Sequence, residues 1–175
     1  METSTQTQST TSAVAIRFGL ITGLISVIIS LALYTTGTEQ SPLKWLSSVV
    51  LIGGLVLAMR QYKQSHGGYM SYGEGLGIGT LLSAVTGVLS AIFIYIYMGF
   101  MDPSAIQRMT DKARSDMEAR GGLSDEQIDQ GMAMTSKFMT VPALTISVLV
   151  GSIIIGFLLS LVISAIIKTS KPEFE

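Results

Sequence analysis

The sequence predicts an all-α integral membrane protein, a bundle of four transmembrane helices with an extramembrane helical hairpin between the third and the fourth. Four long apolar stretches carry this prediction, at residues 14–34, 43–59, 76–101 and 138–167. A helix needs roughly 20 apolar residues to cross the hydrocarbon core, and each stretch meets or approaches that length. The composition agrees, because only 13% of the 175 residues are charged, whereas soluble proteins carry about 25%.

Net charge and composition exclude several classes of function. A formal net charge of −1 provides no basic field for nucleic acid. With no cysteine and a single histidine, the chain cannot build a disulfide framework or a zinc site of thiolates or several histidines. Sequence motifs of serine hydrolases, P-loop proteins and zinc proteases are also missing. We therefore expect no catalytic residue, no cofactor and no metal, and predict that the protein is not an enzyme.

The leader, residues 1–13, is rich in Thr, Ser and Gln, and we expect it to be disordered because it offers almost nothing apolar to bury. It lacks the positive charge that opens a signal peptide, so the stretch 14–34 is predicted to be an uncleaved first span. Arg17 lies in the first turn of this span, where a long basic side chain can reach the headgroups.

The second stretch, 43–59, is the shortest of the four. Trp45 precedes its core, and Arg60, Tyr62 and Lys63 follow it, as expected for residues at a membrane interface. The next segment is a polar connection, in which we expect His66 to be a surface residue of a glycine-rich loop and not a ligand.

The segment 102–137 predicts two amphipathic helices outside the bilayer. Asp102 and Pro103 favour a helix start, and Gly121-Gly122 favours its end. Ser124 and Gln127 have the spacing of a capping box, which predicts the start of a second helix. One continuous helix lying on the membrane surface is the alternative. The apolar positions that could form a partner surface are Ile106, Met109, Met117, Ile128 and Met132.

Within the fourth stretch, Pro142 is expected as a tolerated kink because it falls early in the helix. Small residues recur at every fourth position in three of the four stretches, a pattern that lets membrane helices approach closely. We interpret these faces as packing surfaces within one chain. Homo-oligomerisation through an unused face and a substrate path are the alternatives. The predicted helix-packing residues are Gly19, Gly23, Gly75, Gly79, Ser83, Gly87, Gly151, Gly156 and Ser160.

Arg17 and Glu74 could form an ion pair, because they lie near the starts of the first and third spans, which would run parallel. Snorkelling of Arg17 and stabilisation of Glu74 by a helix N-terminus explain the same residues without a pair. Four spans place both termini on one side of the membrane. Basic residues are nearly even on the two sides, but their position at helix ends favours cytoplasmic termini.

Five features of the chain can be compared with known families: the Gly-rich first span, Tyr72–Gly75, Asp102-Pro103, Gly122–Ile128 and Gly151–Gly156. In these motifs and in its layout the chain resembles the domain-of-unknown-function family forty-one ninety-nine, a family of bacterial membrane proteins. The family's usual exit from the third span is closer to Asn-Pro-Glu, so Asp102-Pro103-Ser104 departs slightly. The resemblance implies a four-span protein of a Gram-negative inner membrane, and it brings no activity, cofactor or catalytic residue.

The function we favour from the sequence is that of a non-enzymatic, multi-pass membrane protein, an accessory or scaffold subunit. Its segment 102–137 would contact a partner or the membrane surface. The alternative is a small transporter or channel, formed by oligomers that pack through the glycine-rich faces. The expected partners are the lipid bilayer and either a second copy or an unidentified membrane protein, with no nucleic acid.

Overall fold

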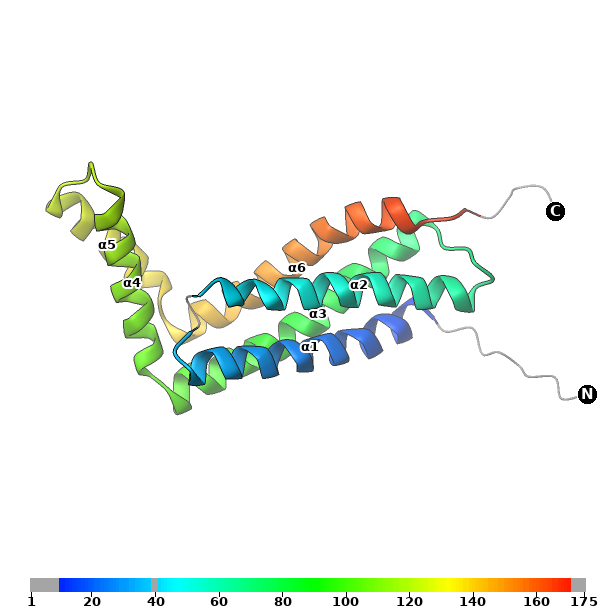
Figure 1. Ribbon diagram of the computed structural model, residues 1–175, viewed down its shortest axis with the longest axis horizontal. Coiled ribbons are helices and arrows are strands. Elements are labelled where there is room, and N and C mark those ends of the chain that lie inside the picture. The colour runs from blue at the N-terminus through cyan, green and yellow to red at the C-terminus, as the bar shows by residue number, and fades with distance from the viewer. Residues whose placement is uncertain (1–9, 39–40, 171–175) are drawn as a thin grey trace, which may run out of the picture. The chain divides into compact units, whose positions relative to one another are not determined.

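The computed structural model describes residues 10–38 and 41–170, so most of the predicted leader (residues 1–9) lies outside the described residues. The described part is helical throughout, and the predicted all-α class is confirmed for it (Figure 1). A short 3-10 helix, η1 (Pro42–Trp45), and a π-helical turn, η2 (Tyr97–Met101), accompany the α-helices. These are α1 (Thr11–Thr35), α2 (Leu46–Ser65), α3 (Tyr72–Ile96), α4 (Ser104–Arg120), α5 (Asp125–Phe138) and α6 (Val141–Ile167).

The chain divides into two compact units. The bundle unit comprises the chain up to Ser90 together with the chain from Val150 onward, and the hairpin unit is Ala91–Leu149. Helices α3 and α6 contribute residues to both units. Each unit is described by itself below.

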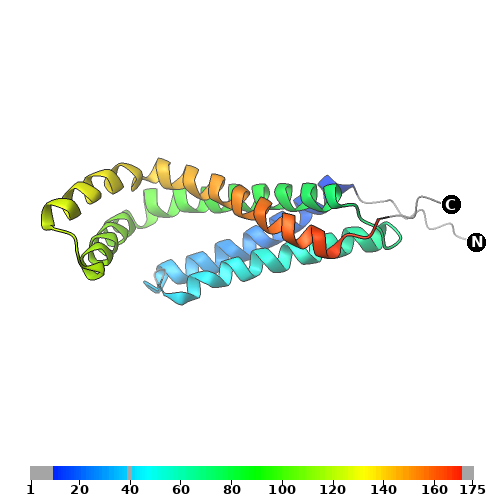
Figure 2. The ribbon, with the colours of Figure 1, turned by 90° about the horizontal axis from the view of Figure 1, so that it is seen from above.

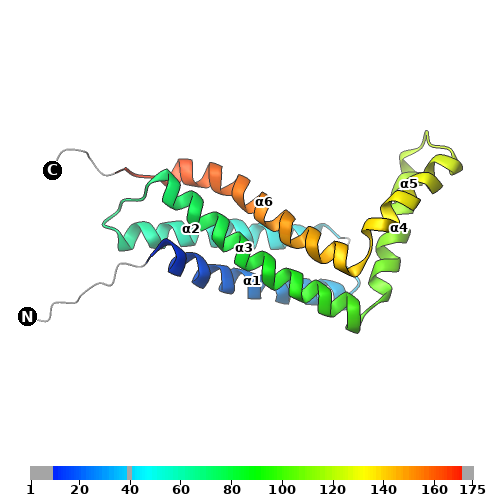
Figure 3. The ribbon, with the colours of Figure 1, turned by 180° about the vertical axis from the view of Figure 1, so that it is seen from behind.

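Four helical segments form the bundle unit. Helices α1 and α2 run side by side in opposite directions, and α3 lies between α1 and α6 (Figures 2 and 3). Helix α3 therefore contacts every other helix of the unit: Gly19 of α1, Leu55 of α2 and Gly156 of α6 each lie against it. We call the end at which α1 begins and α6 ends the terminal end.

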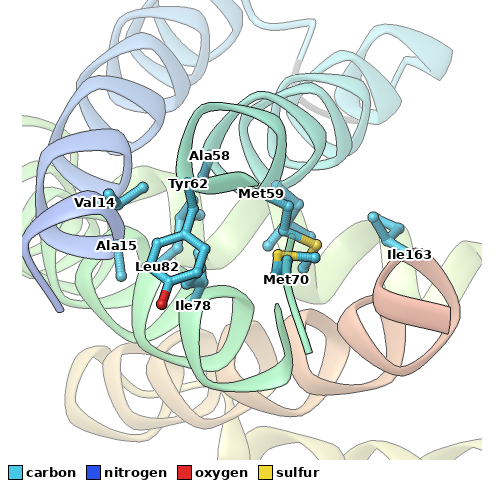
Figure 4. Close-up of a cluster of buried hydrophobic side chains, with 10 residues drawn as sticks. Val14, Ala15, Ala58, Met59, Tyr62, Met70, Ile78, Leu82 and Ile163 are labelled. Atoms are coloured by element: carbon cyan, nitrogen blue, oxygen red, sulfur yellow. The ribbon is translucent and has the colours of Figure 1, made fainter. Parts of the chain in front are cut away.

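A cluster of buried apolar side chains fills the terminal end of the bundle unit (Figure 4). Helix α2 contributes most to it, because its apolar residues recur at helical spacing and so share one face. Chain segments that are far apart in the sequence meet here, which fixes the α2–α3 turn against α1 and α6. The cluster consists of Val14, Ala15, Leu55, Ala58, Met59, Tyr62, Met70, Ile78, Leu82 and Ile163.

The outside of the bundle unit is covered by large apolar side chains. Leu24 is 55% exposed, Ile28 is 65% exposed and Ile166 is 77% exposed. The buried polar side chains are small hydroxyls, namely Thr22, Ser26, Ser83, Thr86, Ser160 and Ser164. Exposed large apolar side chains together with buried hydroxyls are typical of membrane proteins, whose outer surface contacts lipid.

Three helical segments of the described chain are long and apolar enough to cross a membrane: Thr11–Thr35, Tyr72–Met101 and Val141–Ile167. The sequence predicts four, and α2 is the one that does not qualify. Its apolar part ends at Met59, and the rest of the helix is the polar run from Arg60 to Ser65. The predicted second span and part of the predicted loop are thus a single helix.

Two further boundaries differ from the prediction. Helix α1 begins at Thr11, where the Thr10 hydroxyl accepts a hydrogen bond from the Ala13 backbone N–H (3.2 Å), so residues 11–13 are helical and not part of a disordered leader. The chain also breaks after Phe138 and resumes as α6 at Val141. Pro142 therefore sits in the first turn of a new helix, where its missing N–H costs nothing, and does not kink a longer one.

The hairpin unit contains two separate helices, α4 and α5, in place of one continuous surface helix. Helix α4 ends because Gly121 adopts φ 67° and ψ 169°, a conformation that is essentially restricted to glycine. The predicted capping box opens α5: the Ser124 hydroxyl accepts from the Gln127 backbone N–H, and the Gln127 side chain accepts from the Ser124 backbone N–H.

Candidate functional site

A cluster of hydrogen-bonded polar groups lies at the terminal end of the bundle unit. The Tyr62 hydroxyl donates a hydrogen bond to Glu74 Oε1 (2.8 Å), and the Ser71 backbone N–H donates to Glu74 Oε2 (2.7 Å). The Ser71 hydroxyl in turn accepts from the Glu74 backbone N–H (3.3 Å). This reciprocal pattern is a capping box that starts α3. Sequence reasoning missed it, although Ser71-Tyr72-Gly73-Glu74 has the required spacing.

His66 extends this cluster and is not the plain surface residue that the sequence predicts. Its ring stacks on Tyr62 with 4.0 Å between centroids and 22° between planes. Its Nδ1 lies 2.9 Å from the Tyr62 carbonyl oxygen and 3.1 Å from Ser65 Oγ. The stack and these contacts fix the end of α2 next to the start of α3.

A cavity of about 320 Å³ adjoins the cluster. An isolated antiparallel bridge between Met70 and Thr169 borders it, with N···O distances of 3.0 and 2.9 Å. Lys63 Nζ donates to the Ile167 carbonyl oxygen (3.0 Å), which satisfies one of the free carbonyls at the end of α6. The cavity is lined by His66, Tyr69, Met70, Ser71, Glu74, Thr169 and Ser170.

These contacts hold the ends of neighbouring helices in place. Both oxygens of Glu74 accept hydrogen bonds, and the bridge at Met70 joins the α2–α3 turn to the end of α6. The described residues contain no group of three or more His, Cys, Asp or Glu side chains suited to hold a metal ion. The arrangement therefore fastens three helices together at the terminal end.

Arg17 and Glu74 are not brought together as an ion pair among the described residues. Glu74 is engaged by Tyr62 and Ser71. Arg17 instead lines a separate pocket of about 170 Å³ between α1 and α2, which Gln61 also lines.

The predicted packing residues of α3 and α6 meet along an antiparallel seam. A methyl group added at Gly79 would overlap the Ser160 hydroxyl, and one added at Gly156 would overlap the Ser83 hydroxyl. Gly75 faces Ser164 in the same way. Each of these three pairs joins one glycine to one serine, and successive pairs are four residues apart on each helix. This spacing keeps all the contacts on one face of each helix.

A side-chain hydrogen bond crosses the seam, since Ser152 Oγ donates to the Ser83 carbonyl oxygen (3.0 Å). Ser160 Oγ instead donates to the Gly156 carbonyl oxygen of its own helix (2.6 Å). Ser83 Oγ, which is fully buried, finds no partner among the described residues. Gly87 is also buried in α3. Close backbone approach, more than side-chain hydrogen bonding, therefore characterises this contact.

A second close contact joins α1 to α3. A methyl group at Gly19 would lie 2.9 Å from the Leu82 carbonyl oxygen, and one at Gly23 would lie 3.3 Å from the Thr86 Cα. The Thr86 hydroxyl donates to the Gly19 carbonyl oxygen (3.2 Å). Gly151 differs from the other predicted packing residues, because a methyl group added there would meet nothing within 4 Å.

The apolar residues proposed from the sequence as a partner surface lie partly inside the hairpin unit. Ile128 is 5% exposed and Met132 is 9% exposed, so both side chains are largely covered within the hairpin unit itself. Met117 lies against Gly131, at 3.4 Å from the position of an added methyl group. Ile106 and Met109 are half-buried. Amphipathic spacing alone cannot distinguish a face that binds a partner from one that binds the neighbouring helix.

The exposed side of the hairpin unit is charged and internally paired. Arg114 bridges the two helices, with its guanidinium 3.0 Å from Asp129 and 3.0 Å from Glu118. Arg108 pairs with Asp102 across the first turn of α4 (2.8 Å). The hydrogen bond from Arg108, followed by that from Ser104, holds the pKa of Asp102 below its ordinary value of 3.8.

Comparison with known proteins identifies the family. A family model described as "Protein of unknown function (DUF4199)" matches residues 17–169, which include parts of both units. No curated protein and no solved structure matches the chain. The family resemblance predicted from the motifs is confirmed, and the chain belongs to this family.

Proposed function

We propose that this chain is a non-enzymatic, four-span protein of a bacterial inner membrane that acts as an accessory or scaffold subunit. The spanning helices would hold it in the bilayer, and helices α4 and α5 of the hairpin unit would contact a partner outside. One observation carries the proposal. The bundle unit exposes Ile28 and Ile166 while burying Ser83 and Ser160, whereas the pair α4 and α5 buries Ile128 and exposes the charged side chains of Arg114 and Glu118.

Helix α2 is the fourth span in this proposal. Its apolar and small residues from Leu46 to Met59 give a length of about 21 Å, which is shorter than the hydrocarbon core of about 30 Å. A short span of this kind is accommodated by local thinning of the bilayer and by long basic side chains at its end. It runs antiparallel to α1, and Gly54 of α2 lies against Thr22 in the middle of α1. A helix that lies along a spanning helix in this way returns the chain to the side from which it started. The polar end from Arg60 to Ser65 would then lie among the headgroups.

The charges at the terminal end support cytoplasmic termini. Arg17, Arg60, Lys63 and Lys168 lie there, and Glu74 is the sole acidic residue among the described residues of the bundle unit. An excess of basic residues beside the spans favours the cytoplasmic side. Reporter fusions after residue 175 and within residues 121–124 test the orientation. A periplasmic reporter that is active at the C-terminus would contradict it.

The partner contact is assigned to the charged face of the hairpin unit. A shallow groove of about 490 Å³ runs between α4 and α5. Since Ile128 is buried, the groove and its charged rim are what α4 and α5 offer to a protein in water. The groove is lined by Gln107, Thr110, Asp111, Arg114, Asp129, Met132, Ala133 and Ser136.

Photocrosslinking in native membranes tests this function. A photoreactive amino acid at Gln107 or Ser136 should yield one defined protein adduct, whereas the same residue at Leu158, on the apolar outside of α6, should yield lipid adducts. Replacement of residues 102–137 by a neutral linker should abolish co-purification of that protein while the chain stays in the membrane. Adducts from Gln107 and Ser136 to lipid alone would contradict a scaffold role.

The geometry favours this role over the alternative of an oligomeric transporter or channel. That alternative needs glycine faces that are free to join another copy. Gly19, Gly23, Gly75, Gly79 and Gly156 instead lie against other helices of the same chain. A stable oligomer that gives ligand-dependent flux in liposomes would restore the alternative.

A further inference from the structure

We propose that the pocket between α1 and α2 binds the phosphate of an anionic lipid headgroup. The inference rests on the proposed membrane location, because it requires the terminal end of the bundle unit to lie at the bilayer surface. The pocket measures about 170 Å³ and is lined by Ala13, Val14, Arg17, Phe18 and Gln61. It is separate from the cluster around Glu74.

The lining residues suit a phosphate diester. Arg17 supplies a planar guanidinium whose N–H groups match two phosphate oxygens. Gln61, from the neighbouring helix, adds an amide that can donate to the same group. Ala13 lies in the first turn of α1, where the helix dipole is positive. Buried Val14 and half-buried Phe18 provide an apolar wall for the carbons next to the phosphate.

Arg17 is available for such a ligand. Its side chain is exposed, and no carboxylate forms an ion pair with it among the described residues. Glu74, the acid of the same end, is held by Tyr62 and Ser71. Basic residues at the membrane surface attract anionic lipids, and basic pockets between spanning helices bind their headgroups.

The test compares lipid binding by the full chain and by three variants in detergent, using native mass spectrometry. The wild type should retain phosphatidylglycerol in preference to phosphatidylcholine. Arg17→Gln should lower the retained phosphatidylglycerol about fivefold, the effect of one basic residue at the membrane surface. Gln61→Leu should lower it less. Arg120→Gln is the matched control, because it removes an exposed positive charge from the hairpin unit, and it should leave binding unchanged.

A second arm separates lipid from soluble phosphate. Inorganic phosphate and glycerol 1-phosphate, at millimolar concentration, should not displace phosphatidylglycerol. Displacement would overturn the lipid assignment in favour of a soluble anion. Equal retention of the two lipids, or equal loss in Arg17→Gln and Arg120→Gln, would overturn the site itself. Circular dichroism verifies that each variant keeps its helix content.

Alkaline carbonate extraction of the wild type distinguishes the two proposals. Retention in the membrane together with no preference for phosphatidylglycerol would overturn only the headgroup site. Release of the wild type into the supernatant would overturn the membrane location on which the site depends.

Discussion

The α3–α6 seam of the bundle unit and the α4–α5 contact of the hairpin unit are both antiparallel helix pairs, yet they bury opposite kinds of residue. The seam places Gly79 against Ser160 and Gly156 against Ser83. The hairpin buries Ile128 and Met132 and turns its charges outward. In water, burial of apolar side chains drives helices together, whereas lipid offers no such drive and close backbone approach must replace it. The contrast is the one expected if, as we propose, the bundle unit lies in lipid and helices α4 and α5 lie in water.

Overfilling the seam should have the largest effect. Gly156→Val places a branched side chain onto Ser83, and overpacking should lower the free energy of unfolding of the bundle by about 3 kcal/mol. Unfolding by SDS titration in mixed micelles, followed by circular dichroism, measures the change. Gly151→Ala is the matched control on the same helix, because an added methyl group there meets open space.

A double substitution tests the same contact between α3 and α6. Because the side chain that meets Gly156 is Ser83, the pair Gly156→Ala with Ser83→Gly should regain most of the stability that Gly156→Ala alone loses. Equal stability of the single and double variants would show that these two residues do not meet.

In the hairpin unit, removing buried apolar volume should be destabilising, whereas in the α3–α6 seam adding volume is. Ile128→Ala removes buried apolar volume and should cost about 2 kcal/mol in local stability. Amide hydrogen exchange in residues 104–138 should accelerate, while exchange in the bundle unit stays unchanged. Leu123→Ala, which truncates an exposed apolar residue of the loop, should change little. A uniform acceleration throughout the chain would contradict the division into two units.

Loss of a helix cap should have a smaller effect. Ser124→Ala leaves the Gln127 backbone N–H without its acceptor and should cost about 1 kcal/mol. Faster hydrogen exchange in the first turn of α5 is the expected readout. Ser115→Ala, an exposed position in the interior of α4, serves as the control. The same rate of exchange in both variants would show that the cap contributes nothing.

The smallest effect concerns pH at the start of α4. The pKa of Asp102 lies below 3.8 because Arg108 and then Ser104 hydrogen-bond to its charged form. A lowered pKa means that this contact stabilises the folded state above about pH 4 and is lost as the pH falls through the lowered value. NMR titration of the Asp102 carboxyl carbon measures the midpoint. Arg108→Gln should move the midpoint upward, and an unchanged midpoint would contradict the assigned cause.

The sequence predicts where the helices lie better than it predicts which helices contact one another. The spacing of small residues marks which faces of α1, α3 and α6 could pack, and five of those glycines do lie against another helix. The register that sets Gly79 opposite Ser160 depends on where two distant segments meet, and a periodic pattern does not contain that information. Periodicity likewise places Ile128 on the apolar face of its helix, but it does not show which surface covers that face.

One difference has a local cause. The sequence predicts the end of the second span at Met59 because polar residues follow, yet Tyr62 is 4% exposed and belongs to the apolar core, so the helix continues through its polar run. His66 is partly exposed, and its stack on Tyr62 is a contact that the sequence does not predict. The polar cluster at the terminal end could have been found from the capping-box spacing of Ser71 and Glu74, which is the same signal that correctly predicts the start of α5.

The most direct test of two surrounding media is the reactivity of single cysteines, since the chain contains none of its own. Leu158 of α6 is 54% exposed and Met134 of α5 is 68% exposed. If exposure alone decided the reactivity of a cysteine, the two positions would react at similar rates. In native membranes made permeable on both sides, a water-soluble maleimide should label Met134→Cys rapidly and Leu158→Cys only after denaturation. Equal labelling of the two variants before denaturation would contradict a bundle in lipid and a hairpin in water.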